Sequence, residues 1–180
     1  MKATGIVRRI DDLGRVVIPK EIRRTMRIRE GDPLEIYTDK DGEVIFKKYS
    51  MMGGLSEFAS QICETVHKTV HQPAIITDRD SIIALAGLVR REWMEKPISP
   101  TLENILESRQ LYEHQAGAAP FLVTESKSGL FVSLAAPIIA QGDVLGCLLL
   151  ADTEGTWVPS ETERTLLETI SGFLGRHMEG

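Results

Sequence analysis

The first fifty residues consist of segments that are too short to bury a hydrophobic core of their own. Residues 5–10 and 15–18 are rich in Ile and Val, and the polar sequence between them, Asp11-Asp12-Leu13-Gly14, is typical of a turn. This pattern predicts a β-hairpin. A second hairpin is predicted where residues 34–37 and 44–46 flank the turn sequence Asp39-Lys40-Asp41-Gly42.

A very short helix is expected between the two hairpins. Pro19 ends the second strand because it has no N–H to donate. Residues 20–26 carry Ile22 and Met26 four positions apart in an otherwise charged segment, which favours one or two turns of amphipathic helix. Four short strands and such a helix bury too little surface to be stable alone. We therefore expect this unit to need a partner subunit.

Charge divides the chain into two unlike parts. The whole sequence has a net charge of -5 at pH 7. Residues 1–29, however, hold nine basic and three acidic side chains, whereas residues 51–180 hold nine basic and seventeen acidic ones. The N-terminal part is therefore expected to attract a polyanion such as DNA, and the C-terminal part is not.

The apolar periodicity stops at residues 49–54, which include the pair Gly53-Gly54. This break predicts a domain boundary, with one domain at residues 1–52 and a second at residues 53–180. Within the second domain, apolar residues recur every three or four positions from Leu55 to Gln72, as in a helix with one apolar face.

The rest of the second domain alternates predicted strands and helices. Strands are expected at residues 73–77, 81–86, 130–140 and 144–152, the last two joined by a turn at residues 141–143. Residues 90–109 favour a helix that Pro97 and Pro100 interrupt. A C-terminal helix is expected to begin at Ser160, with a capping box completed by Glu163. The fold class is therefore α+β, with an antiparallel sheet covered by helices.

Several functional classes find little support in the sequence. The longest apolar stretch near the C-terminus, residues 144–151, is too short to cross a bilayer, and the start has no apolar leader segment. We therefore expect a cytoplasmic protein without membrane contact. No catalytic triad, glycine-rich phosphate loop or paired-carboxylate site has its motif context, so we expect no enzyme and no cofactor.

Two groups of residues leave weaker alternatives open. His67 and His71 lie four positions apart on the predicted helix, with Glu64 one turn earlier, a spacing that can share a metal ion. With no further ligand in view, a polar helix face is favoured and no metal is expected. Cys63 and Cys147 lie among apolar residues without a C-x-x-C pattern, so buried thiols are favoured over the thiol nucleophile of an enzyme.

The N-terminal sequence from Thr4 to Tyr37 closely resembles the AbrB family of swapped-hairpin transcription regulators. The resemblance rests on Gly14-Arg15-Val16-Val17-Ile18-Pro19, Arg23-Arg24, Gly31-Asp32 and Leu34-Glu35-Ile36. It implies that two chains interleave their hairpins into one dimeric swapped-hairpin β-barrel that binds double-stranded DNA. The size argument, which is independent of the resemblance, also requires a partner.

The same resemblance implies which residues contact DNA. The positions that match the family's DNA contacts are Arg8, Arg15, Arg23 and Arg24, and the supporting basic positions are Arg9 and Lys2. A planar guanidinium suits this role because it can bind a phosphate or a guanine edge through two N–H groups. The alternative for Arg23 and Arg24 is a solvated helix face. We also expect the shape of the DNA to carry much of the specificity.

The second half is similar to GAF domains in its order of elements and in the hairpin sequence Ala135-Ala136-Pro137-Ile138. That similarity implies a regulatory or oligomerisation module able to hold an unidentified small-molecule ligand, with Trp93 and residues 76–86 as candidate lining. Plain core packing is the alternative. An AbrB-like domain followed by a GAF-like domain resembles transcription regulators of spore-forming bacteria. It implies an activator or repressor of sporulation genes that forms a homotetramer through its C-terminal helices.

A different class of function also fits the N-terminal pattern. A swapped hairpin can serve as an antitoxin-like interaction module whose main partner is another protein. Salt-sensitive DNA binding would favour the regulator. A co-purified toxin-like partner would favour the antitoxin-like module.

Overall fold

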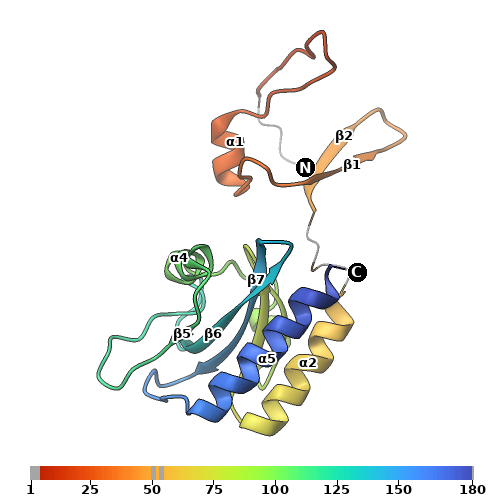
Figure 1. The fold of residues 1–180 in the computed structure, drawn as a ribbon. Helices are drawn as coiled ribbons and strands as arrows, with labels where there is room; N and C mark the ends of the chain where they lie inside the picture. Colours follow the sequence, from red (N-terminus) through yellow and green to blue (C-terminus); the bar gives the residue numbers. More distant parts are fainter. Residues whose placement is uncertain (1–4, 50–51, 53–54, 180) are drawn as a thin grey trace. The chain divides into compact units, whose positions relative to one another are not determined.

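The computed structural model describes residues 5–49, 52 and 55–179. The chain divides into two compact units, Met1–Tyr49 and Ser50–Gly180 (Figure 1). The first unit holds a short helix and a β-hairpin. The second holds a five-stranded sheet with helices on its two faces.

In the first unit, the predicted helix and the second predicted hairpin are confirmed. The helix α1 (Lys20–Thr25) is followed by β1 (Leu34–Thr38) and β2 (Val44–Lys48). The two strands pair in antiparallel register, with Ile36 opposite Phe46. Their apolar residues therefore lie close together on one small ribbon.

The first predicted hairpin forms only at its turn. The N–H of Asp11 donates to the carbonyl of Arg15 at 3.1 Å, and Gly14 takes a positive φ of 75°. Residues 5–10 and 15–18, however, form no strand. An isolated two-stranded hairpin is at best marginally stable, and the apolar side chains of Val7 and Ile10 on these arms stay exposed, so no buried face stabilises a ladder here.

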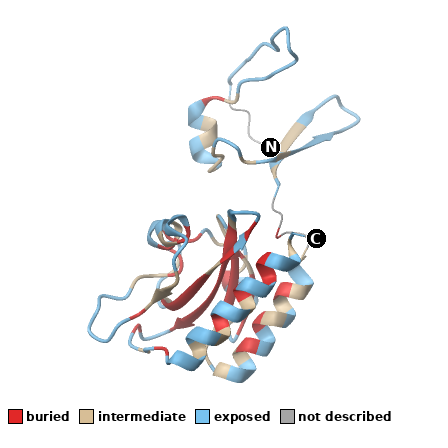
Figure 2. Ribbon diagram, viewed as in Figure 1, coloured by how far each residue is buried: buried red, intermediate tan, exposed pale blue. Residues whose placement is uncertain are grey.

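Apolar side chains of the first unit stay exposed (Figure 2). Val7 is 89% exposed, Leu13 74%, Ile10 69% and Ile36 61%. Of the described residues 5–49, only Pro19 is buried. A unit that buries so little has no core of its own, which agrees with the expectation that it needs a partner.

The second unit is built on an antiparallel five-stranded sheet in the order β4-β3-β7-β6-β5. The strands are β3 (Ala74–Asp78), β4 (Ile82–Ala86), β5 (Tyr112–Glu113), β6 (Phe131–Ala140) and β7 (Asp143–Asp152). The predicted strands, including the β6–β7 hairpin, are confirmed. The two-residue β5 is an addition that the sequence did not predict.

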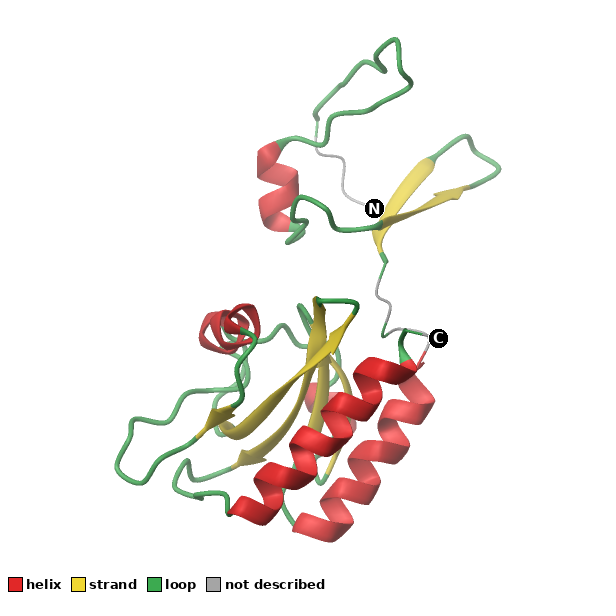
Figure 3. Cartoon of the chain, viewed as in Figure 1, coloured by secondary structure: helices red, strands yellow, loops and turns green. Residues whose placement is uncertain are grey.

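Helices cover both faces of this sheet. The long helices α2 (Ser56–Val70) and α5 (Glu161–His177) lie side by side on one face (Figures 1 and 3). The shorter α3 (Arg90–Trp93) and α4 (Pro100–Ser108) pack on the other. At the start of α5, the predicted capping box between Ser160 and Glu163 is present. None of the helices in the described residues has the length and apolarity to cross a bilayer.

Adjacent residues of the central strands enter different cores. Ile76 and Leu148 pack with α2 and α5, whereas Ile75 and Leu149 pack with α3 and α4. All four side chains are fully buried. Burial on both faces explains why these strands are almost continuously apolar instead of alternating with polar residues. The α+β class predicted for this half is confirmed.

A buried carboxylate at the end of β7 holds the loop that follows. Asp152 is 8% exposed, and its two oxygens accept the N–H groups of Glu154, Thr156 and Trp157 at distances of 2.8–3.2 Å. Burial alone would raise the pKa of this carboxyl. The backbone donors outweigh burial, so the pKa of Asp152 lies below its ordinary value.

We expect Asp152→Ala to lower the free energy of unfolding by about 1–3 kcal/mol, because backbone N–H groups lose their acceptor. Since the folded-state pKa is depressed, the carboxylate stabilises the fold above the ordinary Asp pKa of about 3.9. That contribution is lost as the pH falls through the folded-state pKa. Urea unfolding between neutral and acid pH measures it, with Glu154→Ala in the same loop as control. If the free energies of unfolding of Asp152→Ala and the wild type differed as much at acid pH as at neutral pH, this account would be contradicted.

Candidate nucleic-acid interface

The turn of the first hairpin fixes the position of Arg15. Asp11 Oδ1 accepts the N–H of Leu13 at 3.0 Å and that of Arg15 at 2.8 Å. The second oxygen, Oδ2, accepts the Nε–H of the Arg15 side chain at 2.7 Å. The backbone bond from Arg15 and then its guanidinium lower the pKa of Asp11. One carboxylate thus holds both backbone and side chain of Arg15, while 71% of that side chain stays exposed.

Arg23 and Arg24 lie in the last turn of α1. The helix ends in a Schellman motif, in which the N–H of Ile28 donates to the carbonyl of Arg23 at 2.7 Å and the N–H of Arg27 to that of Arg24 at 3.2 Å. Arg27 has a φ of 52°, at the position where glycine is usual. Successive helix positions differ in direction by about 100°. Arg24 accordingly is exposed, whereas Arg23 is half-buried.

Arg23 also carries an unsatisfied hydrogen-bond donor. Its Nε is buried and has no hydrogen-bond partner among the described residues. A buried N–H without an acceptor is costly, and such groups in native structures are rare. We therefore expect a neighbouring molecule, either a second chain or a nucleic acid, to supply an acceptor at this point.

Two further basic residues of the predicted interface, Arg8 and Arg9, lie on the arm before the turn. Both are exposed there. Lys2 lies outside the described residues. Arg8 and Arg15 therefore come from the two arms of one loop, and the arginine pair of α1 follows in the chain.

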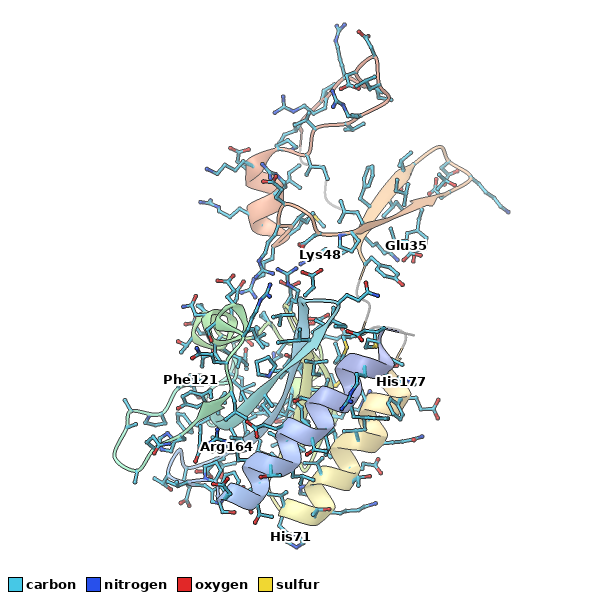
Figure 4. All side chains as sticks on the ribbon, in the orientation of Figure 1. Glu35, Lys48, His71, Phe121, Arg164 and His177 are labelled. Carbon is cyan, nitrogen blue, oxygen red and sulfur yellow. The ribbon has the colours of Figure 1, made fainter. Side chains whose placement is uncertain are left out.

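A separate group of contacts joins the loop after α1, which contains Arg27, Arg29 and Asp32, to Lys48 of β2. The side chain of Asp32, of which 6% is exposed, accepts the backbone N–H of Arg29 at 2.8 Å and lies 3.6 Å from Lys48 Nζ. Lys48 also donates to the carbonyl of Arg27 at 2.7 Å (Figure 4). These contacts stabilise the path of the chain between helix and hairpin, so their role is structural.

The alternative chemistry considered for the second unit finds no support in its geometry. Burial raises the pKa of both the Cys63 and the Cys147 thiol to about 12, so neither is activated as a thiolate near neutral pH. His67 Nδ1 lies 2.8 Å from the carbonyl of Gln72, and its ring lies against Gly87. Within the described part of the chain, no three His, Cys, Asp or Glu side chains gather as a metal site would require.

The candidate ligand lining of the second unit takes part in core packing. Trp93 is 6% exposed, and Ile76, Ile82 and Ala84 are fully buried. The ring of Trp93 also faces Lys127, whose Nζ lies 4.7 Å from the ring centroid. The packing alternative stated from the sequence therefore accounts for these side chains.

Comparison with known proteins adds independent evidence. Residues 54–179 match the family model described as stage V sporulation protein T C-terminal, transcription factor. Residues 7–52 match the model described as antidote-toxin recognition MazE, bacterial antitoxin. Over 179 residues the chain is 45% identical to stage V sporulation protein T of Bacillus subtilis (strain 168), covering 99% of each chain. The chain belongs to the stage V sporulation protein T family.

The two halves of this family member also have separate relatives. Over 49 residues it is 65% identical to the transition state regulatory protein AbrB of B. subtilis, covering 27% of this chain and 50% of AbrB. The solved N-terminal DNA recognition domain of AbrB covers 27% of this chain and 91% of that structure, with 63% identity and a TM-score of 0.24. The second relative is the solved structure of a GAF domain/HD domain protein from Geobacter sulfurreducens. The matched region covers 69% of this chain and 91% of that structure's chain, with 19% identity and a TM-score of 0.52.

Both resemblances inferred from the sequence are thereby confirmed. The first unit is AbrB-like in sequence, the second has the fold of a GAF domain, and the stage V sporulation protein T family is one of transcription regulators. Sequence reasoning treated Asp11 only as a turn residue and missed its bond to Arg15. The signal that could have indicated it is the four-residue spacing of an acidic and a basic residue across a turn that contains Gly14.

Proposed function

We propose that this protein is a DNA-binding transcription regulator of sporulation genes, acting as an activator, a repressor or both. The observation that carries the proposal is the set of arginines on the first unit, in a segment with nine basic and three acidic side chains. The likeness to stage V sporulation protein T and to AbrB over the same residues supports it. The buried thiols offer no nucleophile, so we propose no enzymatic activity.

The proposed division of labour places DNA binding in residues 1–52 and assembly or ligand sensing in residues 53–180. Within the first domain, the direct contacts are proposed to be Arg8, Arg15, Arg23 and Arg24, with Arg9 and Lys2 in support. A single chain offers one set of these groups. Two chains side by side would present twice the charge to a DNA duplex.

The DNA-binding unit is proposed to be a homodimer. A second chain that interleaves its hairpins would cover exposed apolar side chains such as Val7 and Ile10 and give their backbone a strand to pair with. We further propose that two dimers join through the outer face of α2 and α5 into a homotetramer. On that face Phe173 is 51% exposed beside Phe58 and His177.

DNA affinity should fall steeply as salt concentration rises. Each bound phosphate releases condensed counterions, so the slope of log K against log salt concentration is about -0.9 per phosphate. With four arginines on each chain available for contact, we expect a slope steeper than about -4 for the tetramer. Titrations of a labelled duplex at several salt concentrations measure this slope. A flat dependence would remove the proposal.

The variant Arg15→Ala should weaken DNA binding by about tenfold or more, because it removes a charge and a bidentate donor from each chain. Its side chain is exposed and bonds to Asp11 in its own turn, so the oligomer size should not change. Light scattering checks the size, and binding isotherms check the affinity. Lys40→Ala, which removes the same charge from the turn of the second hairpin, is the matched control. If Arg15→Ala and the wild type bound DNA with equal affinity, the assignment of Arg15 to the DNA-binding site would be wrong.

A second candidate function is an antitoxin-like module that binds a protein toxin. One observation favours it, the match of residues 7–52 to a bacterial antitoxin family. The purified chain separates the two candidates. Salt-dependent DNA binding by the chain alone supports the regulator, whereas DNA binding that appears only in complex with a toxin-like protein supports the antitoxin-like module.

A further inference from the structure

We infer that Asp11 is a positioning residue for DNA binding, which holds Arg15 so that the Nη1–Nη2 edge of its guanidinium is presented to DNA. The inference rests on the proposed function, since it requires Arg15 to contact DNA. Asp11 carries the same sign of charge as the DNA phosphates. An acidic side chain inside a DNA-binding turn should by itself repel phosphate and weaken binding.

The geometry of the ion pair explains why an acidic residue is useful here. A guanidinium can bind an acceptor pair through Nε and one Nη, or through its two Nη groups. Asp11 Oδ2 occupies Nε at 2.7 Å. In the described part of the chain, neither Nη group of Arg15 bonds to another residue, and 71% of the side chain is exposed. The Nη1–Nη2 edge is therefore left for a phosphate or for the O6 and N7 atoms of guanine.

Both ends of Arg15 are fixed by the same carboxylate. Oδ1 accepts the N–H groups of Leu13 and Arg15, so the backbone of the turn is held as well as the guanidinium. Arginine otherwise carries much rotamer entropy, and a side chain that is already ordered loses less of it on binding. Pairing with Nε also compensates part of the negative charge of Asp11, which reduces its repulsion of DNA.

Asp12 provides the internal comparison. It is the adjacent residue, carries the same side chain and is exposed, but it bonds to no residue in the described part of the chain. If only the sign of the charge mattered, neutralising either aspartate would strengthen DNA binding equally. If Asp11 positions Arg15, the two substitutions have opposite effects.

The test compares Asp11→Asn with Asp12→Asn in the full-length protein, using binding isotherms with a labelled duplex. Asn keeps one oxygen for the N–H groups of the turn but lacks the second oxygen that holds Nε. We therefore expect Asp11→Asn to bind DNA roughly two- to fivefold more weakly. Asp12→Asn should bind as tightly as the wild type or more tightly. Both variants should keep the oligomer size and unfolding temperature of the wild type, which separates positioning from damage to the fold.

Arg15→Ala and the double variant Asp11→Asn/Arg15→Ala complete a thermodynamic cycle. If Asp11 acts through Arg15, Asp11→Asn causes no further loss once Arg15 is alanine. Tighter binding by Asp11→Asn, or an equal loss in both backgrounds, would overturn the inference and leave Arg15 as a contact. Wild-type affinity of Arg15→Ala would instead refute the site in the proposed function, so the two failures are distinguishable.

Discussion

Replacing Gly175 by alanine should destabilise the second unit, although alanine is the better helix former. Gly175 lies in α5 where the helix crosses β6, and a Cβ at this position would lie 2.1 Å from the backbone oxygen of Ile139. A backbone atom cannot rotate away, so helix or strand must shift. Such overpacking costs about 1–3 kcal/mol and sometimes more, against a gain in helix propensity of about 1 kcal/mol. Because the contact is with backbone, we expect the upper end, and a fall in the unfolding midpoint of at least about 4 °C.

Gly172, three residues earlier in the same helix, is the matched control. It is exposed, and no atom outside the helix's own backbone lies within 4 Å of the position that its Cβ would take. Gly172→Ala should therefore raise the unfolding midpoint by about 2–4 °C. Calorimetry at equal protein concentrations measures both variants. If both shifted the midpoint in the same direction, the close approach of α5 to β6 would not be the reason for glycine at position 175.

The combined substitution Arg23→Ala/Arg24→Ala should nearly abolish DNA binding at moderate salt. It removes two arginines from each chain and hence four from each dimer. If each contact contributes about 1 kcal/mol or more, affinity falls by roughly a thousandfold. The salt slope should also become shallower by about 3 to 4, because fewer counterions are released. Wild-type affinity in this variant would show that α1 is merely a solvated helix, the alternative that the sequence left open.

The variant Arg23→Lys/Arg24→Lys separates charge from geometry at the same two positions. Lysine keeps the positive charge but lacks the planar pair of donors that grips a guanine edge. We therefore expect most of the salt slope to remain while the preference for a specific duplex over a random one decreases. Competition titrations with the two duplexes measure that preference. An unchanged preference would place specificity in the shape of the DNA.

The parts of the fold that the sequence predicted best have determinants only a few residues apart. The capping box joins Ser160 to Glu163. The β6–β7 turn places Gln141 and Gly142 at positive φ values of 49° and 85°, which the turn sequence allows. These local signals are independent of the rest of the chain, so reading them from the sequence alone is reliable.

The parts that escaped prediction depend on neighbours far along the chain or outside it. The strand β5 has only two residues and exists because Tyr112 lies opposite Ala135 of β6. The first hairpin has no ladder in a single chain, in which Val7 and Ile10 on its first arm stay exposed. In the site, the arginines followed from a family resemblance, but the bond from Arg15 to Asp11 depends on side-chain geometry that spacing alone does not determine.

The two buried cysteines can report when each core of the second unit opens. Because burial raises the pKa of both thiols to about 12, almost no thiolate is present at neutral pH. Alkylating reagents should therefore react only when a core opens. Cys63 lies in the core beneath α2 and α5, whereas Cys147 lies in the opposite core. The order in which the two sulfurs are labelled would thus reveal which layer of helices leaves the sheet first.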